Sequence, residues 1–163
     1  MNGIDLILTT LRDGEARLAD QLSGAARRHR DEHEIHYVAG DLAVWSRRHR
    51  RLLEDAVAAR GIEPGSPRGD FAVDTAFAPE PDESTSADGP SHPGLELLRD
   101  LRELHLSAAE NSLHWEMLAQ TAQAAGHSDL LALASGCHPE TLRQMRWTNT
   151  MIKTLSPQIL TNV

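Results

Sequence analysis

Apolar residues recur at helical spacing in four separate stretches of this chain. With 3.6 residues in each turn, side chains three and four positions apart share one face of a helix. The pattern predicts helices over about residues 4–30, 33–60, 95–125 and 128–155. No stretch shows the strict alternation that is typical of a half-buried strand, so the sequence predicts an all-α fold.

Three of the predicted apolar stripes are interrupted by a polar residue that would face the core. Glu15 occupies the missing place in the first stripe, and His49 is the only ionisable member of the second. Glu140 and Gln144 fall on the last stripe. The second stripe consists of Ile35, Val38, Leu42, Trp45, His49, Leu52, Ala56 and Ala59.

Local signals predict where these helices begin and end. Asp31 and Glu34 have the spacing of a capping box that would open the second helix. A glycine follows the second and third helices, and Ser128 is a suitable cap for the fourth. Pro139 predicts a kink or a break near His138, because proline removes a helical hydrogen bond. Pro157 would close the last helix.

Residues 61–94 differ from the rest of the chain and contain six of its prolines. Two interpretations are a linker between domains and a long crossover within one domain. Each half of the chain offers only one helical hairpin, which is too little to bury its own apolar stripes. We therefore expect a single domain, residues 1–163, with the segment FAVDTAF (71–77) against the helices through Phe71, Val73 and Phe77. The layout is that of a four-helix bundle with one long crossover loop between helices 2 and 3.

The two hairpins bring the inward polar residues to matching depths. Glu15 and His49 each lie about seventeen residues from the turn near residue 32, so they should meet. Around the turn near residue 127, Glu110 is level with Gln144, and His114 is level with Glu140. An ionised carboxylate in a core is costly unless it is paired, hydrogen-bonded or bound to a cation. Carboxylate oxygens with one imidazole suit iron or manganese better than a structural zinc site.

In this layout the chain resembles the ferritin-like superfamily of di-iron carboxylate bundles. The resemblance rests on LRDGEARLA around Glu15, the His49 segment that ends at Gly61, the Glu110 helix and the long second connection. That family places a Glu on each of two helices and a Glu-x-x-His on each of the other two. Glu15 and Glu110 match the single glutamates and His49 matches one histidine, but Ser46 stands where its Glu partner would be. The fourth helix has no Glu-x-x-His.

The resemblance implies an iron or manganese site with oxidation or storage chemistry. Its ligands would come from Glu15, His49, Glu110, His114 and Glu140. The residues themselves leave other interpretations open: a Glu15–His49 ion pair without metal, a metal-free bundle that serves as a structural or partner-binding protein, and a carboxylate–histidine pocket for a small molecule.

Composition limits the remaining classes of function. A net charge of −8 disfavours a nucleic-acid or anionic-membrane partner, so the run Arg47–Arg51 is interpreted as a solvated face. Cys137 is the only cysteine, which fits a reducing cytoplasm and excludes a disulfide framework. No run is long and apolar enough to span a membrane. No Gly-rich phosphate loop is present, and no spacing suggests a Ser, His and Asp arrangement. We expect a cytoplasmic protein with a homo-oligomeric or other protein partner.

Overall fold

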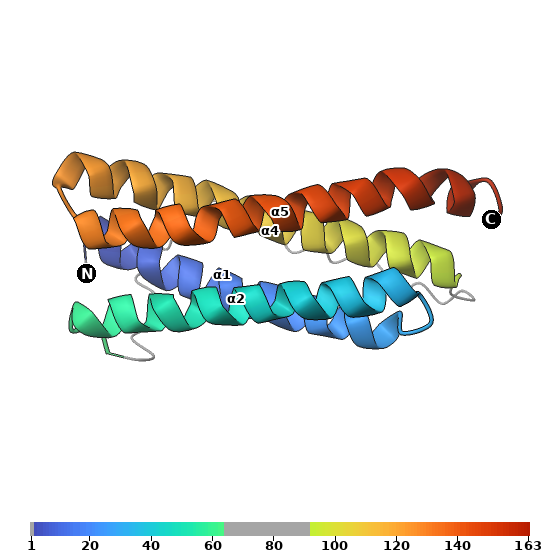
Figure 1. Cartoon of the computed structure of the whole chain (residues 1–163), viewed down its shortest axis with the longest axis horizontal. Helices are drawn as coiled ribbons and strands as arrows, with labels where there is room; N and C mark the ends of the chain where they lie inside the picture. The colour runs from blue at the N-terminus through green and yellow to red at the C-terminus, as the bar shows by residue number, and fades with distance from the viewer. Residues whose placement is uncertain (1, 64–91) are drawn as a thin grey trace, which may run out of the picture.

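The computed structural model describes residues 2–63 and 92–163. The described residues form four helices: α1 (Gly3–Arg28), α2 (His33–Ala59), α4 (Pro93–Ala125) and α5 (Ser128–Leu160). The helices lie side by side along the long axis of the molecule (Figure 1). The predicted all-α four-helix architecture is therefore confirmed, while the expected docking of residues 71–77 falls outside the described residues.

The helices form two antiparallel hairpins, α1 with α2 and α4 with α5 (Figure 1). The hairpins meet mainly where α1 lies along α4, and the second contact between them, of α2 with α5, is much smaller. Helix α2 ends at one end of the bundle and α4 begins at the other (Figure 1). The connection between them therefore joins opposite ends of the molecule.

Burial of the α1 stripe follows the sequence pattern, whereas α2 is rotated relative to its predicted stripe. Glu15 is buried on α1 among the leucines expected around it. On α2, Ser46 and Leu53 are fully buried, while Leu52 is 42% exposed and Ala59 is exposed. The small residues Ala39, Ala43 and Ser46 thus face the core.

The helix ends confirm the glycine signals but not the predicted N-caps. Gly61 has a positive φ of 72°, and the N–H of Ile62 donates to the carbonyl of Val57 at 3.3 Å, which is a Schellman arrangement. The Asp31–Glu34 capping box is wrong, because Glu32 is the N-cap and makes no side-chain cap bond. The N-cap of α5 is His127, so the cap predicted at Ser128 is also wrong.

Helix α5 continues through both of its prolines, so the predicted break near His138 and the predicted end at Pro157 are wrong. An interior proline removes one backbone bond and costs about 3 kcal/mol. Cys137 and Thr141 are buried on either side of Pro139, and burial of the stripe above and below it offsets the lost bond, so that the helix continues. None of the described helices combines the length and the apolar character that a bilayer crossing requires.

Candidate functional site

Polar side chains from all four helices form a buried layer near the middle of the bundle. Each is at most 2% exposed, although leucines and alanines surround the layer above and below. The six members are Glu15 of α1, Ser46 and His49 of α2, Asn111 of α4, and Thr141 and Gln144 of α5. Glu140, Arg48 and Trp115 complete their contacts.

His49 lies between two carboxylates, one at each ring nitrogen. Its Nδ1 is 3.2 Å from Glu15 Oε1, and its Nε2 is 3.1 Å from Glu140 Oε1. An ionised carboxylate only accepts, so both nitrogens donate, and both carry a proton only in the imidazolium form. Burial opposes the charged ring, but the hydrogen bonds and charges of Glu15 and Glu140 outweigh it and raise the pKa of His49. The two carboxylates therefore favour the protonated form of His49.

Glu15 is held from a second side by Trp115 of α4. The indole Nε1 donates to Glu15 Oε1 at 2.9 Å, and the indole ring stands edge-on to the His49 imidazole at 6.0 Å between centroids. The other carboxylate oxygen, Oε2, is buried and has no hydrogen-bond partner among the described residues. The buried Trp115 thus contacts both members of the pair and holds one oxygen of Glu15 toward His49.

Glu140 connects the buried pair to the surface. Its side chain is 19% exposed, and both its oxygens accept from Arg48, which is 44% exposed. Partial burial raises the pKa of Glu140, but the hydrogen bonds from Arg48 and His49 outweigh this effect and lower it overall. Charges therefore alternate from the core outward in the order Glu15, His49, Glu140, Arg48, a series that we call the ion-pair network.

Two amide side chains occupy the remaining space in the layer. Gln144 Nε2 donates to Ser46 Oγ at 2.9 Å and to the carbonyl of Leu42 at 3.1 Å. Asn111 packs its Oδ1 over Gly14, where an added Cβ would lie only 2.3 Å away. Gln144 Oε1 and Asn111 Nδ2 are buried without hydrogen-bond partners among the described residues.

Cys137 lies next to the ion-pair network on α5. Burial, followed by the negative charges of Glu15 and Glu140, raises the pKa of its thiol to about 12. The side chain is 2% exposed. Cys137 is therefore a protonated, buried thiol, as its place on the apolar stripe suggests.

The structure brings three of the five predicted ligand residues together and places two elsewhere. Glu15, His49 and Glu140 meet, as the equal distances from the first turn predict for Glu15 and His49. Glu110 and His114 instead line a groove of about 310 Å³ on α4, with Leu106, Ala109, Leu113 and Met117.

The inward position on α4 belongs to Asn111, one residue after Glu110. Sequence reasoning missed Asn111 although it continues the spacing from Ala108 to Trp115. It also missed Arg48, whose long side chain crosses from an exposed backbone position to Glu140.

The residues in the layer do not fit a two-metal centre. A metal needs a lone pair on an imidazole nitrogen, and both His49 nitrogens face carboxylates. Arg48 already neutralises Glu140. Across residues 2–63 and 92–163, no group of three or more His, Cys, Asp or Glu side chains is arranged to hold a metal ion.

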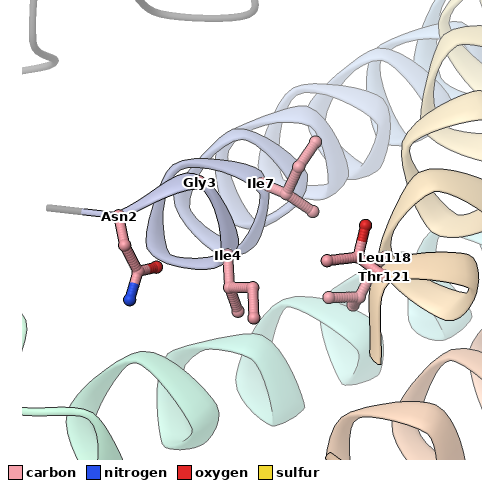
Figure 2. Close-up of a pocket in the computed structure, with 6 residues that line it drawn as sticks. All are labelled: Asn2, Gly3, Ile4, Ile7, Leu118 and Thr121. Carbon is pink, nitrogen blue, oxygen red and sulfur yellow. The ribbon is translucent and has the colours of Figure 1, made fainter. Parts of the chain in front are cut away.

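A separate hollow of about 400 Å³ lies between the start of α1 and the second half of α4. Figure 2 shows Ile4 and Ile7 on one side of it and Leu118 and Thr121 on the other. The described residues that line it carry no charge, and none belongs to the ion-pair network. We therefore assign this hollow no part in the site.

Comparison of the chain with protein-family models, with curated proteins and with solved structures finds no match.

Proposed function

We propose that this chain is a ferritin-like bundle in which an ion-pair network replaces the metal centre, and that it serves as a structural or partner-binding protein. The helix directions support the ferritin-like layout. Helices α1 and α5 run one way and α2 and α4 the other (Figure 1). This arrangement goes with one long crossover between the second and third helices.

The occupation of both His49 nitrogens is the observation that carries the proposal. The six buried positions also parallel the six ligand positions of a di-iron bundle, one on each of two helices and a pair on each of the others. Only Glu15 and His49 keep a ligand side chain of the family type there. Serine, asparagine, threonine and glutamine fill the other four. Hydroxyls and amides are weak ligands for iron or manganese but good partners for a buried ion pair.

Metal loading of protein without a histidine tag tests this proposal. After incubation with Fe(II) or Mn(II) and desalting, we expect no retained metal and no change in melting temperature on chelation. His49→Gln should lower the melting temperature without changing the metal content. One metal ion retained per chain, and lost in His49→Gln, would contradict the proposal.

A single-metal site is the second candidate function, and one distance favours it. The 3.1 Å between His49 Nε2 and Glu140 Oε1 is short enough for one divalent ion to bind both atoms in place of the shared proton. Glu15 on Nδ1 would then be the outer carboxylate that orients a metal-bound histidine. Because Arg48 competes for Glu140, Arg48→Gln should increase metal retention under this candidate and leave it at zero under the first.

The outer face of α4 supports a binding role. Leu106, Leu113 and Met117 are 55%, 63% and 40% exposed and share the groove that holds Glu110. We propose a second copy of the chain as the partner, because a two-fold contact centred near Ala109 sets Leu106 of one copy against Leu113 of the other.

Light scattering should give a dimer for the wild type and a monomer for Leu113→Glu. Val44→Glu, at an exposed position on α2, is the matched control and should remain dimeric.

A further inference from the structure

Ser112, Glu116 and His138 form a second polar cluster, on the side of α4 that meets α5. Ser112 Oγ lies 2.8 Å from His138 Nε2, and His138 Nδ1 lies 3.6 Å from Glu116 Oε2. The cluster extends from the helix interface to solvent. Ser112 is 8% exposed, and the side chains of His138 and Glu116 are 19% and 56% exposed.

The contacts follow the order nucleophile, base and orienting carboxylate. When the Ser112 hydroxyl donates to His138, Nε2 supplies the lone pair and the ring proton lies on Nδ1. That proton faces Glu116, which favours the same tautomer and stabilises the ring once it is protonated. A hydroxyl and a base within 3.2 Å, with the base facing a third group, is the arrangement that activates a serine.

A second hydroxyl–imidazole pair between the same helices lacks these features. His105 Nδ1 is 2.8 Å from Thr148 Oγ1, but that hydroxyl donates its proton to the carbonyl of Met145 at 2.9 Å. No carboxylate in the described part of the chain forms an ion pair with His105. The Thr148 pair therefore resembles the Ser112 pair in distance alone and serves as an internal reference.

We propose that Ser112 is a nucleophile that accepts an acyl group from an activated aryl ester or thioester, with His138 as general base. Ser112 Oγ attacks the carbonyl carbon while its proton moves to His138 Nε2. The bond to the leaving group then breaks, and the aryl oxide or thiolate departs with the electron pair. His138 then releases the proton to solvent, and the acyl group remains on Ser112 as an ester.

The position of Ser112 within α4 decides which acyl donors can react. Backbone N–H groups in the middle of a helix are already bonded to carbonyls one turn earlier, so they form no oxyanion hole. Without these donors, the tetrahedral intermediate must collapse by losing a group that needs no protonation. Aryl esters and thioesters meet this condition, whereas amides and alkyl esters do not.

Reaction of the full chain with p-nitrophenyl acetate tests the proposal. We expect peptide mapping to place one acetyl group on Ser112. Ser112→Ala and His138→Gln should each slow p-nitrophenolate release above background by about 100-fold. Thr148→Ser, which preserves the reference hydroxyl, should leave release unchanged. Acetyl groups confined to Lys153, the N-terminus or imidazoles would overturn the proposal, as would an unchanged rate in Ser112→Ala.

Glu116 acts through His138 and is therefore a positioning residue. Glu116→Gln should slow acetyl transfer, and Glu116→Asp should restore part of the rate, since only a carboxylate stabilises the protonated ring. Because the Glu116 side chain is exposed, neither substitution should unfold the protein, and circular dichroism of each variant checks this. Equal rates in Glu116→Gln and the wild type would remove Glu116 from the proposed site.

Discussion

Glu15 and His49 meet at 3.2 Å across the α1–α2 hairpin, and neither side chain is exposed to solvent. The pair lies at the inner end of the ion-pair network, whose outer end is the partly exposed Arg48. Each inner charge therefore depends on its neighbours for compensation, because water does not reach it. The consequences can be measured in stability, in pH dependence and in thiol reactivity.

Glu15→Gln removes one charge of the buried pair and leaves His49 with Glu140 alone. We expect the free energy of unfolding to fall by about 3 kcal/mol, since an uncompensated buried charge is costly. Urea unfolding measures this loss. Glu54→Gln breaks the exposed pair between Glu54 and Arg50 and is the matched control, with an expected change of less than about 0.5 kcal/mol.

Replacing both partners should cost less than replacing one. Glu15→Leu combined with His49→Leu removes both buried charges, and Glu140 keeps Arg48 as its partner. We expect the double variant to be more stable than either single variant, with a coupling energy of about 2 kcal/mol in urea unfolding. Additive losses would show that the two side chains stabilise the bundle independently.

Stability should depend on pH through His49 and Glu140. The pKa of His49 is raised above its ordinary 6.5, so its contribution is complete below pH 6.5 and is lost as pH rises through the raised value. The pKa of Glu140 is lowered from 4.5, so its contribution is complete above pH 4.5 and is lost as pH falls through the lowered value. The melting temperature of the wild type should therefore exceed that of His49→Gln most between pH 4.5 and 6.5. A difference in melting temperature between the wild type and His49→Gln that grows steadily above pH 8 would contradict this assignment.

Gly14 should not tolerate a methyl group while Asn111 is present. The Cβ of Gly14→Ala would lie 2.3 Å from Asn111 Oδ1, and Asn111 is 2% exposed with little room to turn. We expect a loss of about 2 kcal/mol in the free energy of unfolding, part of which Asn111→Ala should restore. Gly40→Ala is the control, because nothing lies within 4 Å of its added Cβ, and it should stabilise the chain by about 0.5 kcal/mol.

The Cys137 thiol should be unreactive in the folded protein. Its pKa of about 12 leaves almost no thiolate at pH 8, and its side chain is buried. We expect an aromatic disulfide reagent to modify Cys137 only after addition of urea, with a rate that follows unfolding. Fast modification of the native protein at pH 8 would show that the bundle opens next to the ion-pair network.

The sequence predicted the depth of the Glu15–His49 pair because depth in an antiparallel hairpin depends only on distance from the turn. The inward face of each helix was harder to predict, since neighbouring residues differ by 100° around the axis. Glu110 and Asn111 are neighbours and so differ by one step of 100°. The prediction placed Glu110 inside because a carboxylate is a metal ligand, whereas the amide of Asn111 occupies the inward position. Ser46 is buried instead of Trp45 for the same reason, because α2 is rotated relative to its predicted stripe.

Arg48 and Pro139 show two other limits of the sequence pattern. The backbone of Arg48 lies on an exposed face, and only the length of its side chain brings the guanidinium to Glu140 on another helix. Pro139 is a strong local signal for a break, but burial of the stripe on both sides of it outweighs a single lost hydrogen bond. Both outcomes depend on tertiary contacts that no local pattern contains.

The sparse contact between α2 and α5 has a consequence for how the two hairpins assemble. Polar bonds cross this seam at one level, from His49 and Arg48 to Glu140 and from Gln144 to Ser46 and Leu42. Apolar contacts between leucines and alanines have no direction, so a shift along the helix axis changes their energy little. A shift of one helical turn, about 5.4 Å, would separate every polar pair and leave the His49 imidazole buried without a carboxylate partner. The network therefore fixes the register in which the α1–α2 and α4–α5 hairpins pack against each other.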